Sequence, residues 1–350
     1  MNRREFLHPR RLMSVAGPVL GIADELEAPA PSNSEPVMLR FARRAMATTF
    51  EVILPFATAA AHAMAQAALD EIDRLESQLS VFRDTSEVSR LNARAAHHPV
   101  RVERNLFDLL ALADKIHRET EGAFDISVGA LIKTWGFFRR AGRVPTPEER
   151  AAVRERIGMK HVVLDTERQS VFYERQGLEI NLGSIGKGYA LDRAIALLGH
   201  RYDTTNILIH GGHSSMFALG NESPGACGWT IGVADPQRPQ HRRGHLHLRN
   251  RAMATSAATQ QYFEHEGRKL GHLLDPRTAL PAEGMLSATV TAPTAAEADA
   301  LATAFFILGI EKARAYCEQH GQVGAVLITA DAPHRLVVCG QAVDEVEVLR

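Results

Sequence analysis

The order of predicted strands and helices along this chain constrains its fold more than any other feature. Helical periodicity marks 57–79, 103–121 and 145–156, and strand-like segments dominate after residue 160. Two more predicted helices, 294–308 and 310–320, interrupt those strands without a regular strand–helix–strand alternation. This order predicts an α+β fold with a large, mostly antiparallel sheet and flanking helices, rather than a doubly wound parallel sheet. The predicted strands are 48–54, 161–165, 170–173, 205–210, 214–219, 229–234, 245–248, 286–292, 323–329 and 335–339.

Capping signals support two of the predicted helix starts. Thr146 stands before Pro147, and this pair suits the N-cap and first position of a helix. Ser86 is placed to cap a short helix, with Glu87 or Ser89 completing the cap. Gly122 follows the helix 103–121, where a helix stop is expected.

Residues 1–35 are interpreted as a removable leader and linker, and residues 36–350 as one domain. Asn2-Arg3-Arg4-Glu5-Phe6-Leu7 resembles a twin-arginine export signal, and a short apolar stretch and an acidic, Pro-rich spacer follow it. The alternative interpretation is a disordered cytoplasmic tail. We expect an exported, periplasmic or otherwise extracytoplasmic protein without a transmembrane span, because no apolar stretch is long enough for one. No cysteine follows the leader, so no lipid attachment is expected.

Composition argues against several classes of protein. The 40 Lys and Arg residues nearly balance the 41 Asp and Glu residues, so the chain has no basic footprint for nucleic acid. Its three cysteines, Cys227, Cys317 and Cys339, are far apart in sequence and predict neither a zinc site nor a disulfide framework. The chain also has neither a nucleophile elbow nor a His-Glu-x-x-His motif, which argues against a serine hydrolase and a zinc peptidase.

Residues 179–194 are predicted to form the end of a buried strand, a glycine-rich turn with one lysine, and the first turns of a helix. The first N–H groups of a helix, its dipole and the charge of Lys187 together favour an anion at this turn, and phosphate is the obvious candidate. The P-loop motif requires Ser or Thr where this chain has Gly188, and the dinucleotide-binding motif requires Gly where it has Leu191. The alternative is a helix start whose glycines only permit close packing.

Asp299 and Thr303 are four residues apart on the predicted helix 294–308, and therefore share one face one turn apart. Carboxylate and hydroxyl oxygens suit a hard cation such as Mg²⁺, which leaves coordination positions for water or substrate phosphate. The alternative is a capped or solvated helix face. The alanine-rich surroundings favour a buried helix, in which an unpaired carboxylate would be unfavourable.

Two further segments carry groups suited to chemistry. His272 lies in a run with Asp275 and Arg277, where it could act as a general base, although Asp275 could instead pair with Arg277 in an ordinary turn. Upstream, Gly122–Asp125 and the aromatic segment 135–137 place apolar surface near a carboxylate, as a flat heterocycle requires. The alternative for this second segment is a set of core aromatics.

Taken in order, these segments resemble the ApbE family, the FAD:protein FMN transferases, from Ala45 to about Gly340. The resemblance implies an exported α+β enzyme with a T-fold-related architecture. It further implies that the enzyme binds FAD, uses Mg²⁺, and transfers FMN to a threonine hydroxyl of an acceptor flavoprotein with release of AMP. The motifs that carry the resemblance are Met46–Glu51, Leu79–Asn92, Gly122–Asp125, Trp135–Phe137, Asn181–Asp192, His210–Gly212, Ala254–Ser256, His272–Thr278 and Ala298–Thr303.

The resemblance also implies roles for single residues. Metal binding is assigned to Asp299 and Thr303 with the backbone carbonyl of Gly186, and general-base catalysis to His272. Contacts to the flavin substrate are assigned to Met46, Phe82, Ala123, Phe124, Asp125, Gly183, Lys187 and Leu273.

Four positions depart from the family pattern. Asn181 and His213 stand where family members commonly have Asp, and Ala257 and Ala279 stand where they have Gly. Two alternatives to flavin transfer therefore stay open. One is an FAD pyrophosphatase that gives FMN and AMP, and the other is a flavin-binding protein with impaired catalysis.

Overall fold

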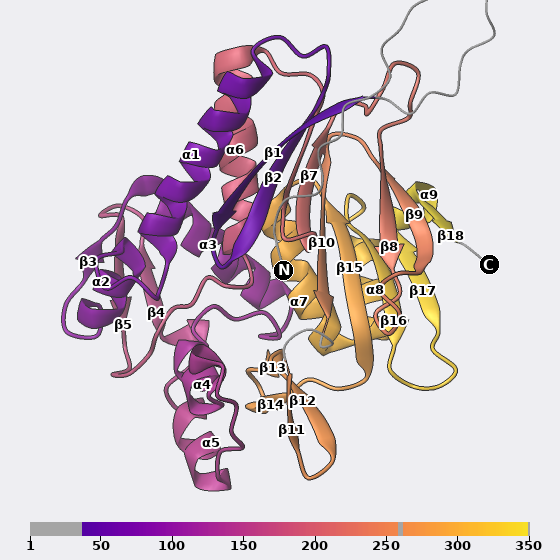
Figure 1. Cartoon of the computed structure of the whole chain (residues 1–350). Helices are drawn as coiled ribbons and strands as arrows, with labels where there is room; N and C mark the ends of the chain where they lie inside the picture. Colours follow the sequence, from indigo (N-terminus) through magenta and orange to yellow (C-terminus); the bar gives the residue numbers. More distant parts are fainter. Residues whose placement is uncertain (1–36, 258–261, 349–350) are drawn as a thin grey trace, which may run out of the picture. The chain divides into compact units, whose positions relative to one another are not determined.

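Strands from the whole length of the chain form one large antiparallel sheet in the computed structural model (Figure 1). The structure describes residues 37–257 and 262–348. Within these residues the sheet has eight strands in the order β1-β2-β6-β7-β10-β15-β16-β17, and each neighbouring pair is antiparallel. The strands are β1 (Met38–Ala45), β2 (Thr48–Pro55), β6 (Ile207–Gly211), β7 (Ser215–Leu219), β10 (Arg251–Ala257), β15 (Met285–Ala292), β16 (Gly324–Thr329) and β17 (Leu336–Gly340).

The alternation of side chains along each strand gives the sheet two apolar faces. On β2, Phe50, Val52 and Leu54 belong to the larger hydrophobic core, which contains the helices. Ile53 points the other way, into a second core that includes Trp229. This division decides which side chains of a strand reach the helices and which reach the opposite face.

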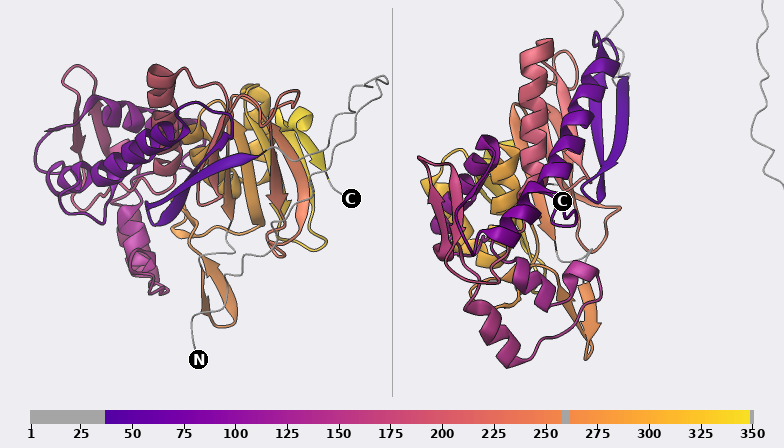
Figure 2. Two further views of the ribbon diagram at one scale, coloured as in Figure 1. Left: turned by 45° about the horizontal axis from the view of Figure 1, so that its top comes forward. Right: turned by 90° about the vertical axis from the view of Figure 1, so that its left-hand side faces the viewer.

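Helices cover the first face of the sheet, where α1 and α6 run side by side (Figures 1 and 2). The next helix, α7, packs against α6 and against β10 and β15. It is apolar nearly all round, which is typical of a helix enclosed by other elements. The helices on this side are α1 (Ala61–Leu79), α2 (Glu87–Arg94), α3 (Arg104–Glu119), α6 (Gly186–Tyr202), α7 (Ala295–Leu308) and α8 (Ile310–Gln319).

Shorter elements surround this framework. A three-stranded sheet, β18-β9-β8, contributes Trp229, Leu246 and Leu248 to the core on the second face. A separate small core holds Leu131, Trp135 and Leu274 together. These shorter elements are β3 (Val100–Arg101), α4 (Gly129–Thr134), η1 (Phe137–Arg139), α5 (Pro147–Arg154), η2 (Met159–His161), β4 (Val162–Asp165), β5 (Ser170–Tyr173), β8 (Trp229–Ala234), β9 (Arg242–Leu248), β11 (Tyr262–His265), β12 (Arg268–Gly271), β13 (Leu274–Asp275), β14 (Leu280–Pro281), α9 (Ala342–Glu345) and β18 (Val346–Val348).

The α+β fold class is confirmed, as are both predicted helix caps. The side chain of Ser86 accepts a hydrogen bond from the N–H of Ser89, and Thr146 forms a reciprocal capping box with Glu149. The helix predicted from residue 57 begins at Ala61, because Ala60 before it adopts a left-handed conformation.

Two strands of the main sheet were not predicted. The sequence of β1 mixes arginines with apolar residues, and that of β10 is rich in small residues with modest strand propensity. Pairing with β7 on one side and with β15 on the other makes β10 a strand, which no local signal could reveal. The predicted leader, residues 1–35, lies outside the described residues. In the part that the structure describes, no helix is both long and apolar enough to cross a bilayer.

Candidate functional site

The predicted glycine-rich turn forms the start of α6. The side-chain oxygen of Asn181 accepts the N–H of Gly183 at 2.9 Å, which closes a tight local turn. Gly186 then begins the helix, and its N–H donates to the carbonyl of Leu182 at 2.7 Å. The segment therefore reaches the helix N-terminus in the way that the sequence predicts.

The anion held at this helix start is a carboxylate of the protein itself. Gly188 donates its backbone N–H to Oδ2 of Asp299 at 2.7 Å, and Nζ of Lys187 lies 3.6 Å from the same oxygen. Asp299 is only 5% exposed, so the N–H group and the ammonium both act on a carboxylate that water hardly reaches. The sequence predicted an anion at this turn but proposed phosphate rather than Asp299.

A glycine of this turn is also needed for close packing, as the alternative interpretation of the turn predicts. A Cβ on Gly188 would lie 1.9 Å from the carbonyl oxygen of Ala295, at the start of α7. A Cβ on Gly186 would meet only Leu182, at an ordinary 3.7 Å. Thus Gly188 permits the contact between α6 and α7, whereas Gly186 is not required for packing.

A serine donates a second hydrogen bond to Asp299. Ser215, at the start of β7, is fully buried and donates its hydroxyl to Oδ1 of Asp299 at 2.5 Å. Sequence reasoning missed this residue, because Ser215 and Asp299 are 84 positions apart and no local pattern links them.

Thr303 lies one turn further along α7, on the same face as Asp299. Its hydroxyl is 3.4 Å from the backbone carbonyl of Asp299 and 3.2 Å from the hydroxyl of Ser256 on β10. The structure therefore brings Lys187, Asp299 and Thr303 together where α6, α7 and the sheet meet. Oxygen ligands of this kind suit a hard cation, and one carboxylate suffices for Mg²⁺ when substrate phosphate and water supply further ligands.

Asp192 joins α6 to α7 a turn beyond Gly188. Its two oxygens accept the N–H groups of Ala295 and Ala296, at 2.7 and 2.9 Å, and so cap α7 from another helix. Burial raises the pKa of Asp192 to about 7, although these two hydrogen bonds act in the opposite direction. Asp192 also lines a cavity of about 290 Å³ together with Tyr189 and Arg193.

The segment after α3 is buried. Ala123 and Phe124 are 1% and 0% exposed, so a ligand on this segment would meet their backbone rather than their side chains. Asp125 accepts the N–H groups of Ser127 and Met159, and Nδ1 of His117 lies 3.4 Å from its carboxylate. Burial raises the pKa of Asp125, and the nearby His117 opposes this effect.

An aromatic pair joins the exposed Phe82, just after the end of α1, to the half-buried Phe138 in η1. Phe82 is 68% exposed and stacks on Phe138, with ring centroids 4.6 Å apart and planes at 19°. The ammonium of Lys133 lies 5.1 Å from the centre of the Phe138 ring. Phe82 therefore offers a flat apolar surface to solvent, and the sequence identified Phe82 but not Phe138.

His272 and Leu273 connect β12 to β13. The ring of His272 lies edge-on to Phe137 at a centroid distance of 6.4 Å, and Leu273 packs against the main core. Both carboxylate oxygens of Asp275 accept hydrogen bonds from Arg277 at 2.9 Å, so the predicted alternative of an Asp–Arg turn is confirmed. Asp275 and Arg277 therefore form an ion pair with two hydrogen bonds within this turn.

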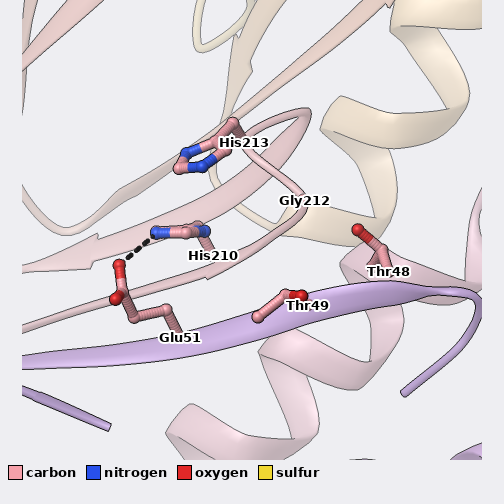
Figure 3. Close-up of a pocket in the computed structure, with 6 residues that line it drawn as sticks. All are labelled: Thr48, Thr49, Glu51, His210, Gly212 and His213. Atoms are coloured by element: carbon pink, nitrogen blue, oxygen red, sulfur yellow. Dashed lines mark hydrogen bonds and ion pairs between the residues drawn. The ribbon is translucent and has the colours of Figure 1, made fainter. Parts of the chain in front are cut away.

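A cavity of about 300 Å³ lies where the β1–β2 and β6–β7 turns meet (Figure 3). His213 stacks over His210 at a centroid distance of 4.5 Å, and Nε2 of His210 lies 2.9 Å from the carboxylate of Glu51. Met46 lies in the adjoining β1–β2 turn, which has a left-handed conformation at that residue. The described residues that line this cavity include neither Lys187 nor Asp299.

Comparisons with known proteins agree on one family. The model of the ApbE family matches residues 46–327. An FAD:protein FMN transferase from Klebsiella pneumoniae is 32% identical, with 76% of this chain and 82% of that protein covered, and one from Treponema pallidum is 33% identical, with 81% and 82% covered. The crystal structure of the ApbE protein from Thermotoga maritima superposes with a TM-score of 0.79 at 27% identity, covering 88% of this chain and 98% of that one.

Proposed function

Because this chain belongs to the ApbE family, we propose that it transfers FMN from FAD to a threonine hydroxyl of an acceptor protein and releases AMP. Its relatives in Klebsiella pneumoniae and Treponema pallidum are named FAD:protein FMN transferases, so a transferase acting on a protein acceptor is the activity that the comparisons support. The dependence on Mg²⁺, the threonine target and the release of AMP are part of this proposal.

The observation that carries this proposal is the junction of α6 and α7. There the buried carboxylate of Asp299 lies between the N–H of Gly188 and the ammonium of Lys187. A pyrophosphate is attacked more readily when cationic groups neutralise the charge on its oxygens. Lys187 is partly exposed, and in the proposal it turns from Asp299 toward the FAD pyrophosphate.

Mg²⁺ would be held by Asp299, Thr303 and the backbone carbonyl of Gly186. These donors fit the ion because all three are oxygens, and a bound cation would pair the charge of the buried Asp299 carboxylate. When bound, Mg²⁺ would polarise the phosphoryl oxygens of the substrate.

The remaining assigned residues would bind the flavin and activate the acceptor. His272 would take the proton of the threonine hydroxyl as the threonine oxygen attacks the phosphorus of the FMN half, while the P–O bond of the pyrophosphate breaks and AMP leaves. The exposed face of Phe82 suits stacking with the isoalloxazine ring, and the Asn181–Gly183 turn would hold the backbone near the substrate. Met46, Asp125 and Leu273 are proposed as further flavin contacts.

We also propose that the enzyme acts outside the cytoplasm. Arg3 and Arg4, followed by a short apolar stretch, support export through the twin-arginine route. Cell fractionation of the wild type and of a variant with both arginines replaced by lysine would test this. Export of the wild type alone is the expected result, and equal export of both would contradict it.

Incubation with FAD and Mg²⁺, with and without a candidate acceptor, tests the reaction. A mass gain of one FMN on the acceptor, with an equal amount of AMP, is the expected result. Release of AMP and free FMN regardless of acceptor would instead identify an FAD pyrophosphatase. Binding of FAD without either product would identify a flavin-binding protein. Asp299→Ala should abolish product formation, and a variant that kept the wild-type rate with Mg²⁺ present would refute the metal assignment.

A further inference from the structure

Two serines on the sheet contact the two side chains of α7 that are assigned to the metal. Ser215 on β7 donates to Oδ1 of Asp299, and the hydroxyl of Ser256 on β10 lies 3.2 Å from that of Thr303. The strands β7 and β10 are neighbours, with Ser215 paired to Ala254. The two contacts therefore come from one patch of the sheet that faces one side of α7.

The contact of Ser215 is the more demanding of the two. Ser215 is 0% exposed, so its hydroxyl cannot exchange Asp299 for water without a local opening of the structure. A buried hydroxyl next to a buried carboxylate favours this hydrogen bond strongly, because the hydroxyl of Ser215 and Oδ1 of Asp299 would otherwise lose each other as partners without gaining water. Asp299 is thus held from two directions, by Ser215 on Oδ1 and by Gly188 on Oδ2.

This arrangement still leaves Asp299 able to bind a cation. An ionised carboxylate has about four lone-pair sites on its two oxygens. Ser215 occupies one site on Oδ1, which leaves the second site on that oxygen for a ligand. The two protein donors therefore set the orientation of the carboxylate without exhausting its capacity to bind.

We propose that Ser215 is the positioning residue of the metal site, and that its hydroxyl fixes the Asp299 carboxylate in the orientation that binds the divalent cation. The inference rests on the proposed function, since it takes Asp299 as a metal ligand. Groups that orient a metal ligand contribute to affinity because the free site need not reorganise when the ion binds. Ser256 has the corresponding position beside Thr303, and its hydrogen bond of 3.2 Å is longer and therefore weaker than that of Ser215.

A matched pair of variants separates the hydroxyl from the volume of the side chain. Ser215→Thr keeps the hydroxyl and Ser215→Val lacks it, while both add similar bulk. Binding of Mn²⁺ alone, followed by electron paramagnetic resonance in the absence of FAD, reports on the site without relying on turnover. We expect Ser215→Val to bind Mn²⁺ about 10- to 100-fold more weakly than Ser215→Thr. Equal Mn²⁺ affinity in the two variants would overturn the proposal.

Further variants keep the test decisive if the bulkier side chains disturb folding. Ser215→Ala removes the hydroxyl without added bulk, and Ser214→Ala removes a neighbouring hydroxyl whose contact is with the carbonyl of Gly211. We expect Ser215→Ala to bind Mn²⁺ about 10- to 100-fold more weakly than wild type, and Ser214→Ala to bind it as wild type does. The melting temperatures of both variants show whether they are folded. Wild-type Mn²⁺ affinity in folded Ser215→Ala would also overturn the proposal.

Asp299→Ala distinguishes failure of this inference from failure of the proposed function. Loss of Mn²⁺ binding in Asp299→Ala, with unchanged binding in the Ser215 variants, would remove only the positioning role. Unchanged Mn²⁺ binding in Asp299→Ala would remove the metal assignment itself, and the role of Ser215 with it. Retained Mn²⁺ affinity in Ser215→Thr, together with weaker binding in Ser215→Val and loss of binding in Asp299→Ala, is the result that supports both the metal assignment and the positioning role.

Discussion

Gly188 donates its backbone N–H to the carboxylate of Asp299 at 2.7 Å, which joins the first turn of α6 to the interior of α7. The two helices can approach this closely only because residue 188 has no side chain: a Cβ there would lie 1.9 Å from the carbonyl oxygen of Ala295. One glycine thus provides both the space for the contact and the donor that holds the carboxylate.

Replacement of Gly188 should therefore damage both folding and the site. We expect Gly188→Ala to lower the free energy of unfolding by about 3 kcal/mol or more, because the added methyl group collides with backbone. Gly199→Ala on the same helix is the control, since no atom lies within 4 Å of its new Cβ. That variant should gain about 0.5–1 kcal/mol from higher helix propensity. Chemical denaturation measures both values, and a Gly188→Ala variant as stable as wild type would contradict the packing argument.

The raised pKa of Asp192 predicts that the stability of the protein depends on pH. Burial raises its pKa to about 7 from an ordinary value near 3.8, so the folded state favours the protonated carboxyl. Its stabilising contribution is therefore complete below pH 3.8 and is lost as the pH rises through about 7. Asp192→Asn, which does not titrate, should lack this contribution to the pH dependence.

Denaturation of wild type and Asp192→Asn at a series of pH values between 4 and 8 measures the effect. The free energy of unfolding of wild type, minus that of the variant, should decrease with rising pH by at most a few kcal/mol. A difference that stays constant, or that increases toward pH 8, would show that Asp192 is ionised in the folded protein at acid pH.

His213 should influence the titration of His210. Burial contributes most to the lowered pKa of His210, the hydrogen bond with Glu51 raises it, and the nearby His213 lowers it again, as does Arg40. His213→Asp replaces a potential cation with an anion and should raise the pKa of His210. Glu51→Gln removes the favourable partner and should lower it further. Titration of the imidazole resonances by NMR measures both shifts, and shifts of the same sign in the two variants would refute this account.

The exposed face of Phe82 should contribute to flavin affinity. Aromatic stacking contributes about 0.5–1.5 kcal/mol, so Phe82→Ala should weaken FAD binding by about 2- to 12-fold. Phe56→Ala is a matched control, because Phe56 is also a phenylalanine and has a similar exposure of 66% beside 68%. Quenching of flavin fluorescence gives both affinities. Equal losses in the two variants would argue that Phe82 has no specific role.

Much of the site could be inferred from local patterns. The spacing of Asp299 and Thr303 placed both on one face of a helix, and the helix has that face packed against α6 and the sheet. The glycine-lysine turn was correctly predicted as a helix start that attracts an anion. These inferences succeeded because helical periodicity and helix termini depend on residues close in sequence.

Contacts between distant segments could not be inferred in this way. The sequence could not reveal that the Asp299 carboxylate lies at the glycine-lysine turn, because it had no means of placing α7 beside α6. It likewise missed Phe138 beside Phe82, and β10, whose small residues form a strand only between their two neighbours.

The sequence by itself determined the α+β class, the caps at Ser86 and Thr146, and the residue types available for phosphate and cation chemistry. Each of these depends on propensities and spacings within a few residues. Only the tertiary structure decided that Gly188, Ser215 and Asp299 meet, because their contacts join segments 111 and 84 positions apart. Such contacts form when packing of the sheet against its helices buries the carboxylate and thereby requires donors for it.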